Sequence, residues 1–283
     1  MKPDEQDLHS LDSHFRFGEN WSEFEKKVGE ERIAFAIESL DRLIEKTSLS
    51  GSKVIDIGCG SGLSMLAALH LGAKDVVGLD LDPKSVGAAK VLLGRFAQGK
   101  NWSVEEKSVF DIDSKSSSKK YDVVHSWGVL HHTGDMWRAL GVAAELVAPG
   151  GVFCFAIYRK TLMCSFWRLE KKFYSNSSPW IQKIIRGLFK LIVIFGLTIT
   201  MRNPSKYLRD YKKSRGMDLH HDVHDWLGGY PYESASPPEL QAFLESRGFN
   251  VTRAFTKKAF CFGLLGSHCD EYVARKNTHL CVE

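Results

Sequence analysis

The chain has 283 residues, of which 43% are hydrophobic and 25% charged, as in an ordinary globular protein. Its 38 basic and 34 acidic side chains leave a net charge of +4, which is too small to indicate a nucleic-acid-binding protein but does not oppose contact with an anionic surface. The six cysteines include no C-x-x-C pair, so neither a zinc site nor a dithiol redox centre is expected. The polar, acidic start is not a signal peptide, and we expect a reduced, cytoplasmic protein, with membrane association as the alternative.

Residues 1–50 are expected to form a cap segment ahead of the main domain. They include the aromatic-rich stretch H-F-R-F-G-E-N-W, residues 14–21, and then a helical pattern with charges between its apolar positions. The apolar face of that helix consists of Ile33, Phe35, Ile37, Leu40, Leu43 and Ile44.

Strands and helices alternate through residues 51–158, which we expect to form the core domain. The predicted order is strand 53–57, helix 63–71, strand 75–81, helix 84–96, strands 102–109 and 121–126, helix 136–146 ended by Pro149-Gly150-Gly151, and strand 151–158. Residues 239–283 add helix 239–246 and strands 249–255 and 271–274 at the far edge of the sheet. The alternation predicts an α/β fold, with a doubly wound, mostly parallel seven-stranded sheet.

Residues 159–238 are too many for a simple connection, and we interpret them as a largely helical insertion after the fifth strand. Their apolar run, 184–201, has an uncharged centre too short to cross a bilayer, which needs about 20 residues. We expect this run to form a helix buried against the domain, as a substrate lid or a homodimer face. Peripheral contact with a membrane surface through 184–201 is the alternative.

A glycine-rich loop follows the first predicted strand, in the stretch V-I-D-I-G-C-G-S-G. Gly58, Gly60 and Gly62 permit a tight turn and a close approach of the backbone to a ligand. The NAD fingerprint G-x-G-x-x-G would place its third glycine at position 63, where this chain has Leu63. The spacing therefore argues against an NAD-dependent oxidoreductase, which we keep as an alternative.

Two acids stand at the ends of the first two strands. Asp56 precedes the loop, where a carboxylate would sit badly beside a pyrophosphate but well beside an ammonium or sulfonium group. Asp80 lies near the end of the second strand, from which an acid can accept both hydroxyls of a ribose. Together they describe a cationic, phosphate-free adenosine compound, and S-adenosylmethionine fits that description.

Four motifs in this order resemble those of class I S-adenosylmethionine-dependent methyltransferases, most closely the branch that includes quinone-biosynthesis methylases. They are V-I-D-I-G-C-G-S-G, V-V-G-L-D-L-D-P, Y-D-V-V-H-S-W-G-V-L-H-H and V-A-P-G-G-V-F, within residues 53–158. F-G-E-N-W, S-W-G-V-L-H-H-T-G and D-W-L-G-G-Y-P-Y-E are similar to a subgroup of bacterial methyltransferases with poorly defined substrates. The resemblance implies a Rossmann-like methyltransferase fold with S-adenosylmethionine as the cofactor.

The resemblance also implies which residues contact the methyl donor. They are Asp56, Gly58, Gly60 and Gly62 at the methionine end, Asp80 at the ribose, Leu81 and the pair Ser108 and Val109 at the adenine, and Ser126 and Trp127 at the border with the acceptor. Position 108 departs from the family pattern, since many relatives carry an aspartate there.

Methyl transfer is an in-line displacement that benefits from alignment and from a dry pocket. We expect the N-terminal segment and the insertion to close over the donor, because both are rich in aromatic residues, whose faces can also stabilise a sulfonium. The aromatic residues are Phe15, Phe17, Trp21, Trp226, Tyr230 and Tyr232, with Trp21 expected at the donor. The alternative is that they only pack a small cap.

A hydroxyl acceptor must lose a proton, and histidine is the usual base. The candidate bases are His131, His132, His221 and His224, and packing or capping is the alternative role for the first two. The stretch 220–225 could equally form a metal site, supply a base, or be a polar turn whose acids cap a helix or pair with Arg215. We expect His132, His224 and Asp222 to be catalytic and predict no metal cofactor.

The sequence thus predicts an S-adenosylmethionine-dependent methyltransferase with a small-molecule acceptor. The apolar insertion favours a greasy acceptor, methylated at a hydroxyl or carbon of a phenol or quinone precursor, or a lipid-linked or sugar metabolite. Nucleic acid is not expected, because the D/N-P-P-Y/F signature is absent and the basic pairs in K-K-F-Y and Y-K-K-S-R are interpreted as solvated surface. A non-catalytic scaffold that binds the donor is a further alternative.

Overall fold

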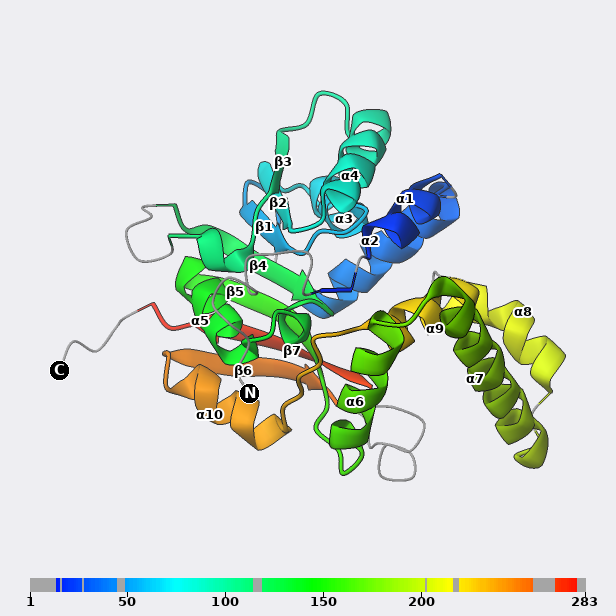
Figure 1. Ribbon diagram of the computed structural model, residues 1–283. Coiled ribbons are helices and arrows are strands. Elements are labelled where there is room, and N and C mark those ends of the chain that lie inside the picture. Colours follow the sequence, from blue (N-terminus) through cyan, green and yellow to red (C-terminus); the bar gives the residue numbers. More distant parts are fainter. Residues whose placement is uncertain are drawn as a thin grey trace.

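The computed structural model describes residues 14–15, 17–26, 28–44, 49–113, 119–201, 203–215, 219–256 and 268–278. A seven-stranded sheet with helices on both faces forms its centre (Figure 1). The strands are β1 (Lys53–Ile57), β2 (Asp75–Asp80), β3 (Trp102–Glu106), β4 (Tyr121–Trp127), β5 (Val147–Tyr158), β6 (Phe249–Phe255) and β7 (Cys269–Lys276). Their spatial order is β3-β2-β1-β4-β5-β7-β6, with β7 antiparallel to both neighbours and the other pairs parallel. The predicted doubly wound, mostly parallel sheet is confirmed.

Helices flank the sheet and fill the insertion. They are α1 (Gly18–Glu25), α2 (Glu30–Ile44), α3 (Leu63–His70), α4 (Pro83–Phe96), α5 (Met136–Leu146), α6 (Cys164–Ser175), α7 (Pro179–Ile199), α8 (Pro204–Arg215), α9 (Leu219–Gly228) and α10 (Pro237–Glu245), with short 3₁₀ turns η3 (Val109–Asp111) and η4 (Leu130–His132). The chain moves outward from β1 to β3 and then returns to β4. The strand order therefore reverses between β1 and β4, and ligands of such sheets bind at the carboxyl ends of strands at this point.

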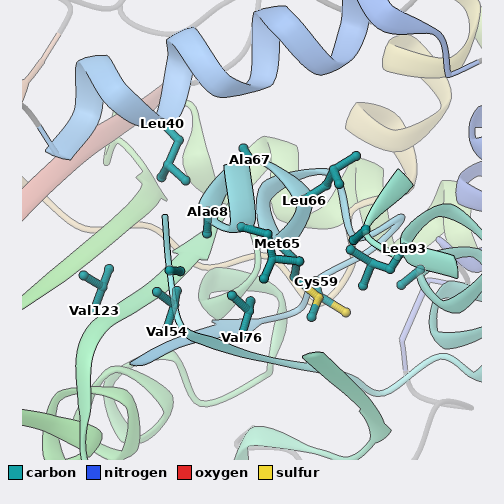
Figure 2. Close-up of a cluster of buried hydrophobic side chains, with 14 of the residues drawn as sticks. Leu40, Val54, Cys59, Met65, Leu66, Ala67, Ala68, Val76, Leu93 and Val123 are labelled. Atoms are coloured by element: carbon teal, nitrogen blue, oxygen red, sulfur yellow. The ribbon is translucent and has the colours of Figure 1, made fainter. Parts of the chain in front are cut away.

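Two apolar clusters cover the two faces of the sheet. Side chains alternate along β1, so that Val54 joins one cluster while Ile55 and Ile57 join the other. Figure 2 shows the first cluster, in which Leu40 of α2 and Met65 of α3 pack over β1, β2 and β4. The second cluster contains the buried faces of α5 and α10. This packing makes the sheet a rigid base for the loops at its carboxyl edge.

Two predicted boundaries are wrong. The strand expected over 102–109 ends at Glu106, because the side chain of Ser108 accepts a hydrogen bond from the N–H of Phe110 and caps η3. The strand expected to begin at Gly151 begins at Val147, so Pro149 and Gly150 lie within β5, beside an irregularity in its pairing with β4. Strand pairing across the sheet overrides the local turn signal here.

The apolar run of the insertion forms most of α7, but the expectation that it is buried against the domain is wrong. Among the residues of α7 only Leu197 is buried. The inward side of the helix contacts α6 and α9 through Ile185, Arg186 and Phe189. These residues form only a narrow strip, although the helix is apolar on most of its faces. Within the described part of the chain, none of the helices combines the length and hydropathy required to cross a membrane.

Candidate functional site

The glycine-rich loop joins β1 to α3 at the carboxyl edge of the sheet. Gly58, Gly60 and Gly62 have φ values of 73°, 54° and 78°, in the left-handed region that favours glycine. The N–H groups of Gly58 and Cys59 both donate to the carbonyl oxygen of Leu79, at 2.7 and 3.0 Å, and hold the loop against the end of β2. A Cβ atom at position 58 would overlap the methyl groups of Val129. The turn therefore depends on glycine for both conformation and space.

Asp80 at the end of β2 contacts this loop directly. Its Oδ2 accepts the N–H of Gly60 and its Oδ1 accepts the N–H of Asp82, each at 2.9 Å. Burial raises the pKa of Asp80 to about 6, although both N–H groups act in the opposite direction. Each oxygen has a further lone pair, so the carboxylate can also accept hydrogen bonds from a diol beside the loop. This arrangement fits the ribose of the predicted donor.

Asp56 is paired with a residue that the sequence analysis missed. His125 of β4 lies opposite it in the parallel register, and its Nδ1 donates to Oδ1 of Asp56 at 2.7 Å. The two side chains are only 7% and 5% exposed. Asp56 is the third residue of V-I-D-I and His125 the third of V-V-H-S. Aligning these two parallel strands by their apolar residues would have predicted that the two side chains are neighbours. The expectation that Asp56 faces the ammonium of the donor stays a prediction.

The N-terminal segment covers the loop. The indole of Trp21 lies so close that a Cβ atom on Gly60 would be 3.1 to 3.3 Å from three of its atoms. Asp82, at the N-cap of α4, accepts hydrogen bonds from its own helix at Lys84 and from the N–H of Gly18, at 2.9 and 2.8 Å. The structure therefore brings Trp21 to the predicted donor site.

The remaining donor residues are distributed differently. Leu81 directly follows β2 and is partly exposed, whereas Val109 is buried in the second apolar cluster. Ser126 is fully buried and donates to the carbonyl oxygen of Ile57 at 2.9 Å. Trp127 is 49% exposed, and its Nε1 donates to Glu271 of β7 at 3.1 Å. Ser126 and Trp127 thus make contacts within the sheet, and their place at the border with the acceptor stays a prediction.

A second group of side chains lies beyond β4 and β5. The rings of His131 and Tyr158 are 4.0 Å apart between centroids, and those of His131 and His132 are 4.3 Å apart. Nδ1 of His132 donates to the carbonyl oxygen of Pro231 at 2.7 Å, and Tyr232 packs on Tyr158 at 5.3 Å. We call His131, His132, Tyr158 and Tyr232 the acceptor-side cluster.

Burial controls the charge of both histidines. It lowers the pKa of His132 to about 3 and that of His131 well below its usual value, with their mutual proximity and Lys171 acting in the same direction for His131. Both rings are therefore neutral at pH 7. Neither ring nitrogen of His131 makes a well-formed side-chain hydrogen bond within the described residues. Such imidazoles can hold a hydroxyl by hydrogen bonding but bind a proton weakly.

Lys171 of α6 is completely buried beside this cluster, which corrects the interpretation of K-K-F-Y as solvated surface. Its Nζ donates to the carbonyl oxygen of Trp226 and lies 4.0 Å from the centre of the indole ring and 5.5 Å from that of Tyr232. Burial lowers the pKa of Lys171 to about 7, while burial raises the pKa of Glu170 to about 7. No local pattern signals this, because a pair of lysines on a helix is normally exposed.

The other two catalytic candidates, His224 and Asp222, each make hydrogen bonds to other residues of the insertion. Nδ1 of His224 lies 2.7 Å from the hydroxyl of Tyr174 and 3.0 Å from Nη1 of Arg186. Asp222 accepts a hydrogen bond from the hydroxyl of Tyr211. The side chains of Arg215, His220 and His221 lie outside the described residues, and with them the expected pairing with Arg215 and the expected roles of the two histidines. Among the side chains that are described, no three His, Cys, Asp or Glu residues are arranged to hold a metal.

Aromatic contacts connect His224 to the acceptor-side cluster. Phe15 packs edge-on against His224 at 5.1 Å and against Phe17 at 4.9 Å, and Phe17 lies 5.6 Å from His132. The N–H of Phe15 also donates to the carbonyl oxygen of Tyr230 at 2.9 Å. The N-terminal segment therefore packs between the insertion and the sheet edge, as the expected cap would.

Comparison with known proteins agrees with this geometry. Residues 28–254 match the family model of a methyltransferase domain. A ubiquinone biosynthesis O-methyltransferase from Rhizobium etli is 28% identical over 187 residues, which cover 61% of this chain and 72% of the relative. A ribosomal protein L11 methyltransferase from Haemophilus influenzae is 36% identical over 118 residues, or 42% of this chain and 36% of the relative, so the match spans about a third of that protein.

Two solved structures share the fold. Magnesium protoporphyrin IX methyltransferase from Synechocystis with bound SAH has a TM-score of 0.51 and 18% identity, with 87% of this chain and 84% of that chain covered. PKMT2 from Rickettsia typhi in complex with AdoHcy has a TM-score of 0.57 and 19% identity, with 87% and 53% covered. At these identities the likeness concerns the fold alone.

Proposed function

Because the chain belongs to the methyltransferase-domain family, whose members take the methyl group from S-adenosylmethionine, we propose that it methylates a small-molecule acceptor held between the sheet edge and the insertion. The observation that carries this proposal is the contact between Asp80 and Gly60 beneath Trp21. A carboxylate, a glycine turn and an indole meet at the point where the strand order reverses. The carboxylate suits a cationic nucleoside better than a pyrophosphate.

The donor, when bound, supplies an electrophilic methyl group on a positively charged sulfur. Asp80 would orient the ribose, and the glycine loop would let the backbone approach the methionine portion. Trp21 would exclude water from the methionine portion of the donor and present its aromatic face to the positively charged sulfur. The contribution of these residues is alignment in a dry site, which is the main requirement of a displacement at carbon.

The acceptor-side cluster supplies the second half of the proposed site. Nδ1 of His132 donates to the carbonyl oxygen of Pro231, and the backbone of Gly229 lies beside the same ring. Because burial lowers its pKa to about 3, we propose that His132 helps to position the acceptor and does not remove its proton. His224 and Asp222 are engaged by Tyr174 and Tyr211, and we propose that they act through the position of α9.

We infer that the acceptor is partly apolar, because aromatic rings predominate in this cluster and in the insertion above it. A hydroxyl or carbon of a phenol or quinone precursor, or a lipid-linked or sugar metabolite, meets this description. The similarity to a ubiquinone biosynthesis O-methyltransferase supports the first class. Residues 159–238 would act as the substrate lid and residues 1–50 as the cap of the donor.

The test combines calorimetry with isotope labelling. We expect heat on titration of the full chain with S-adenosylmethionine and with S-adenosylhomocysteine, and a melting temperature that NAD does not raise. Metabolite extracts incubated with methyl-labelled donor should then contain one labelled product. Stabilisation by NAD alone would overturn the proposal in favour of an oxidoreductase. Donor binding without labelled product in any extract would favour a non-catalytic scaffold.

A further inference from the structure

One side of α7 is apolar and exposed along its whole length. The residues on this side recur every three or four positions, with one adjacent pair, and are each 44% to 70% exposed, as expected for a single stripe along a helix. They are Trp180, Ile184, Leu188, Leu191, Ile192, Phe195 and Ile199. The opposite side of the helix packs inward through Ile185 and Phe189. The stripe therefore lies on the outside of the insertion.

The neighbouring helix α6 adds a second exposed apolar stripe. Phe166, Leu169 and Phe173 are 53%, 69% and 62% exposed, and α6 packs against α7. In Figure 1, α7 and α8 project away from the sheet, and the seven apolar residues of the α7 stripe stay exposed beside the other described elements. Monomeric proteins rarely expose apolar area on this scale without a partner. We call the exposed apolar residues of α6 and α7 the apolar face.

Positive charge is concentrated in the same part of the chain. Residues 159–215 contain fourteen Lys and Arg but only two Asp and Glu, a net charge of +12. The whole chain carries +4, so the remaining residues sum to −8. Exposed basic side chains occur on each of the three helices α6, α7 and α8. They are Arg168, Lys172, Lys183, Lys206 and Arg209.

We infer that the apolar face binds the surface of an anionic phospholipid bilayer, with α7 lying in the plane of the interface. Apolar side chains would enter the boundary between headgroups and acyl chains, and the nearby basic side chains would be attracted to the anionic headgroups. A homodimer through the same face would bring two segments of charge +12 together, and this repulsion favours the bilayer as the occupant.

Helix α6 connects this surface to the acceptor-side cluster. Phe166, Leu169 and Phe173 point outward, whereas Trp167 and Lys171 on the other side of the same helix are buried, with Lys171 beside Tyr158 and Tyr232. The width of one helix therefore separates the inferred bilayer surface from the proposed acceptor site. A lipid-borne acceptor follows from this geometry; that step rests on the proposed function, whereas the binding surface does not.

Vesicle co-sedimentation of the full chain tests the surface. We expect binding to vesicles of phosphatidylcholine mixed with phosphatidylglycerol, and at least about ten-fold weaker binding to phosphatidylcholine alone or in high salt. Leu188→Glu and Phe195→Glu should each weaken binding about ten-fold or more. Val91→Glu is the matched control, because Val91 is 51% exposed but lies on α4, and this variant should bind as the unchanged protein does.

Two other measurements keep the outcomes distinct. Donor calorimetry and thermal unfolding should be the same for all three variants, so a loss of vesicle binding is separated from misfolding and from failure of the proposed function. Absence of binding to phosphatidylglycerol vesicles, or equal loss in Val91→Glu, would overturn the inference. A dimer in light scattering that Leu188→Glu dissociates would assign the apolar face to a second copy of the chain instead.

Discussion

The main-chain N–H of Gly18 donates a 2.8 Å hydrogen bond to the carboxylate of Asp82, 64 residues further along the chain. Asp82 is buried and also caps α4, so a single side chain joins the start of α1 to the start of α4. This contact fixes the N-terminal segment where Trp21 covers Gly60. The cap over the glycine-rich loop is therefore held by a contact that has no room for a side chain at position 18.

Gly18→Ala is expected to weaken donor binding. The methyl group of the alanine would overlap the Asp82 carboxylate and move α1 away from the loop. Loss of a hydrogen bond to a charged group costs about 1.5–3 kcal/mol. If the cap must close on the donor, the donor Kd should rise roughly ten- to a hundred-fold. Gly29→Ala is the control, because nothing lies within 4 Å of its Cβ position. Calorimetry with S-adenosylmethionine measures both, and equal affinities would show that the cap does not contribute.

Gly58→Ala should destabilise the fold itself. A left-handed conformation costs a residue with a side chain about 1–2 kcal/mol, and the overlap with Val129 adds about 1–3 kcal/mol. Gly87→Ala, in the exposed part of α4, should instead be neutral or slightly stabilising, since no atom lies near its Cβ position and alanine favours helix. Urea unfolding measures the free energy of unfolding of both variants. If Gly58→Ala lowered it by less than about 1 kcal/mol, the turn at position 58 would not require glycine.

Donor affinity should fall as the pH falls through about 6. Burial raises the pKa of Asp80 to about 6, so below that pH the group is protonated and loses its capacity to accept both ribose hydroxyls. Asp80→Asn should bind the donor weakly and with little change between about pH 5 and 7. The measurement is the donor Kd across this range. A wild-type Kd that is independent of pH would separate Asp80 from donor binding.

Asp80 should also make the stability of the fold depend on pH. The direction is opposite to that of a salt-bridged acid, whose pKa is lowered in the fold. Its pKa is 3.8 in the unfolded chain and about 6 in the fold, so the folded state holds the extra proton between these values. The contribution of Asp80 to stability is therefore greatest below about pH 4 and is lost as the pH rises through 6. The stability of Asp80→Asn relative to wild type should increase over the same interval.

His125→Leu is expected to cost about 3–5 kcal/mol of unfolding free energy. It removes the partner of the Asp56 carboxylate and leaves a buried charge without its hydrogen bond. The double variant Asp56→Leu/His125→Leu should recover part of this loss, because it removes the charge as well. Urea unfolding of the two variants measures the difference. A double variant less stable than His125→Leu would contradict an energetic pairing of these residues.

Lys171→Met should change how stability depends on pH. The pKa of Lys171 falls from its usual 10.5 to about 7 on burial, so the unfolded chain takes up a proton between these values and the stability of the wild type rises with pH there, by at most about 1.4 kcal/mol per pH unit. Lys171→Met should lack this rise. Glu170, with a pKa of about 7, titrates mainly below this window.

The control for that variant is its exposed neighbour on α6. Lys172→Met should keep the pH dependence of the wild type, because Lys172 is solvent-exposed. Unfolding free energies at about pH 7, 8 and 9 distinguish the two variants. Parallel profiles of Lys171→Met and wild type would mean that Lys171 keeps its proton in the fold.

Local patterns in the sequence were sufficient to predict the fold class of this protein and the position of the glycine-rich loop and of Asp80 at one edge of the sheet. The alternation of strands and helices, the three glycines at positions 58, 60 and 62, and the acid at the end of β2 are each encoded within a few consecutive residues. Such signals depend on backbone conformation and periodicity, which neighbouring residues determine. They were enough to predict the sheet and the family, while the donor contacts stay a prediction.

Tertiary structure decided the rest, because the partners are far apart in sequence. The pairing of Asp56 with His125 depends on the register of two strands, and the burial of Lys171 depends on how α6 packs against α9. Helix α7 is exposed because α6 and α9 cover only a narrow strip of its surface. Its apolar composition alone did not indicate this. Packing between distant segments determines which side chains lose contact with water, and a single segment read along the chain does not contain that information.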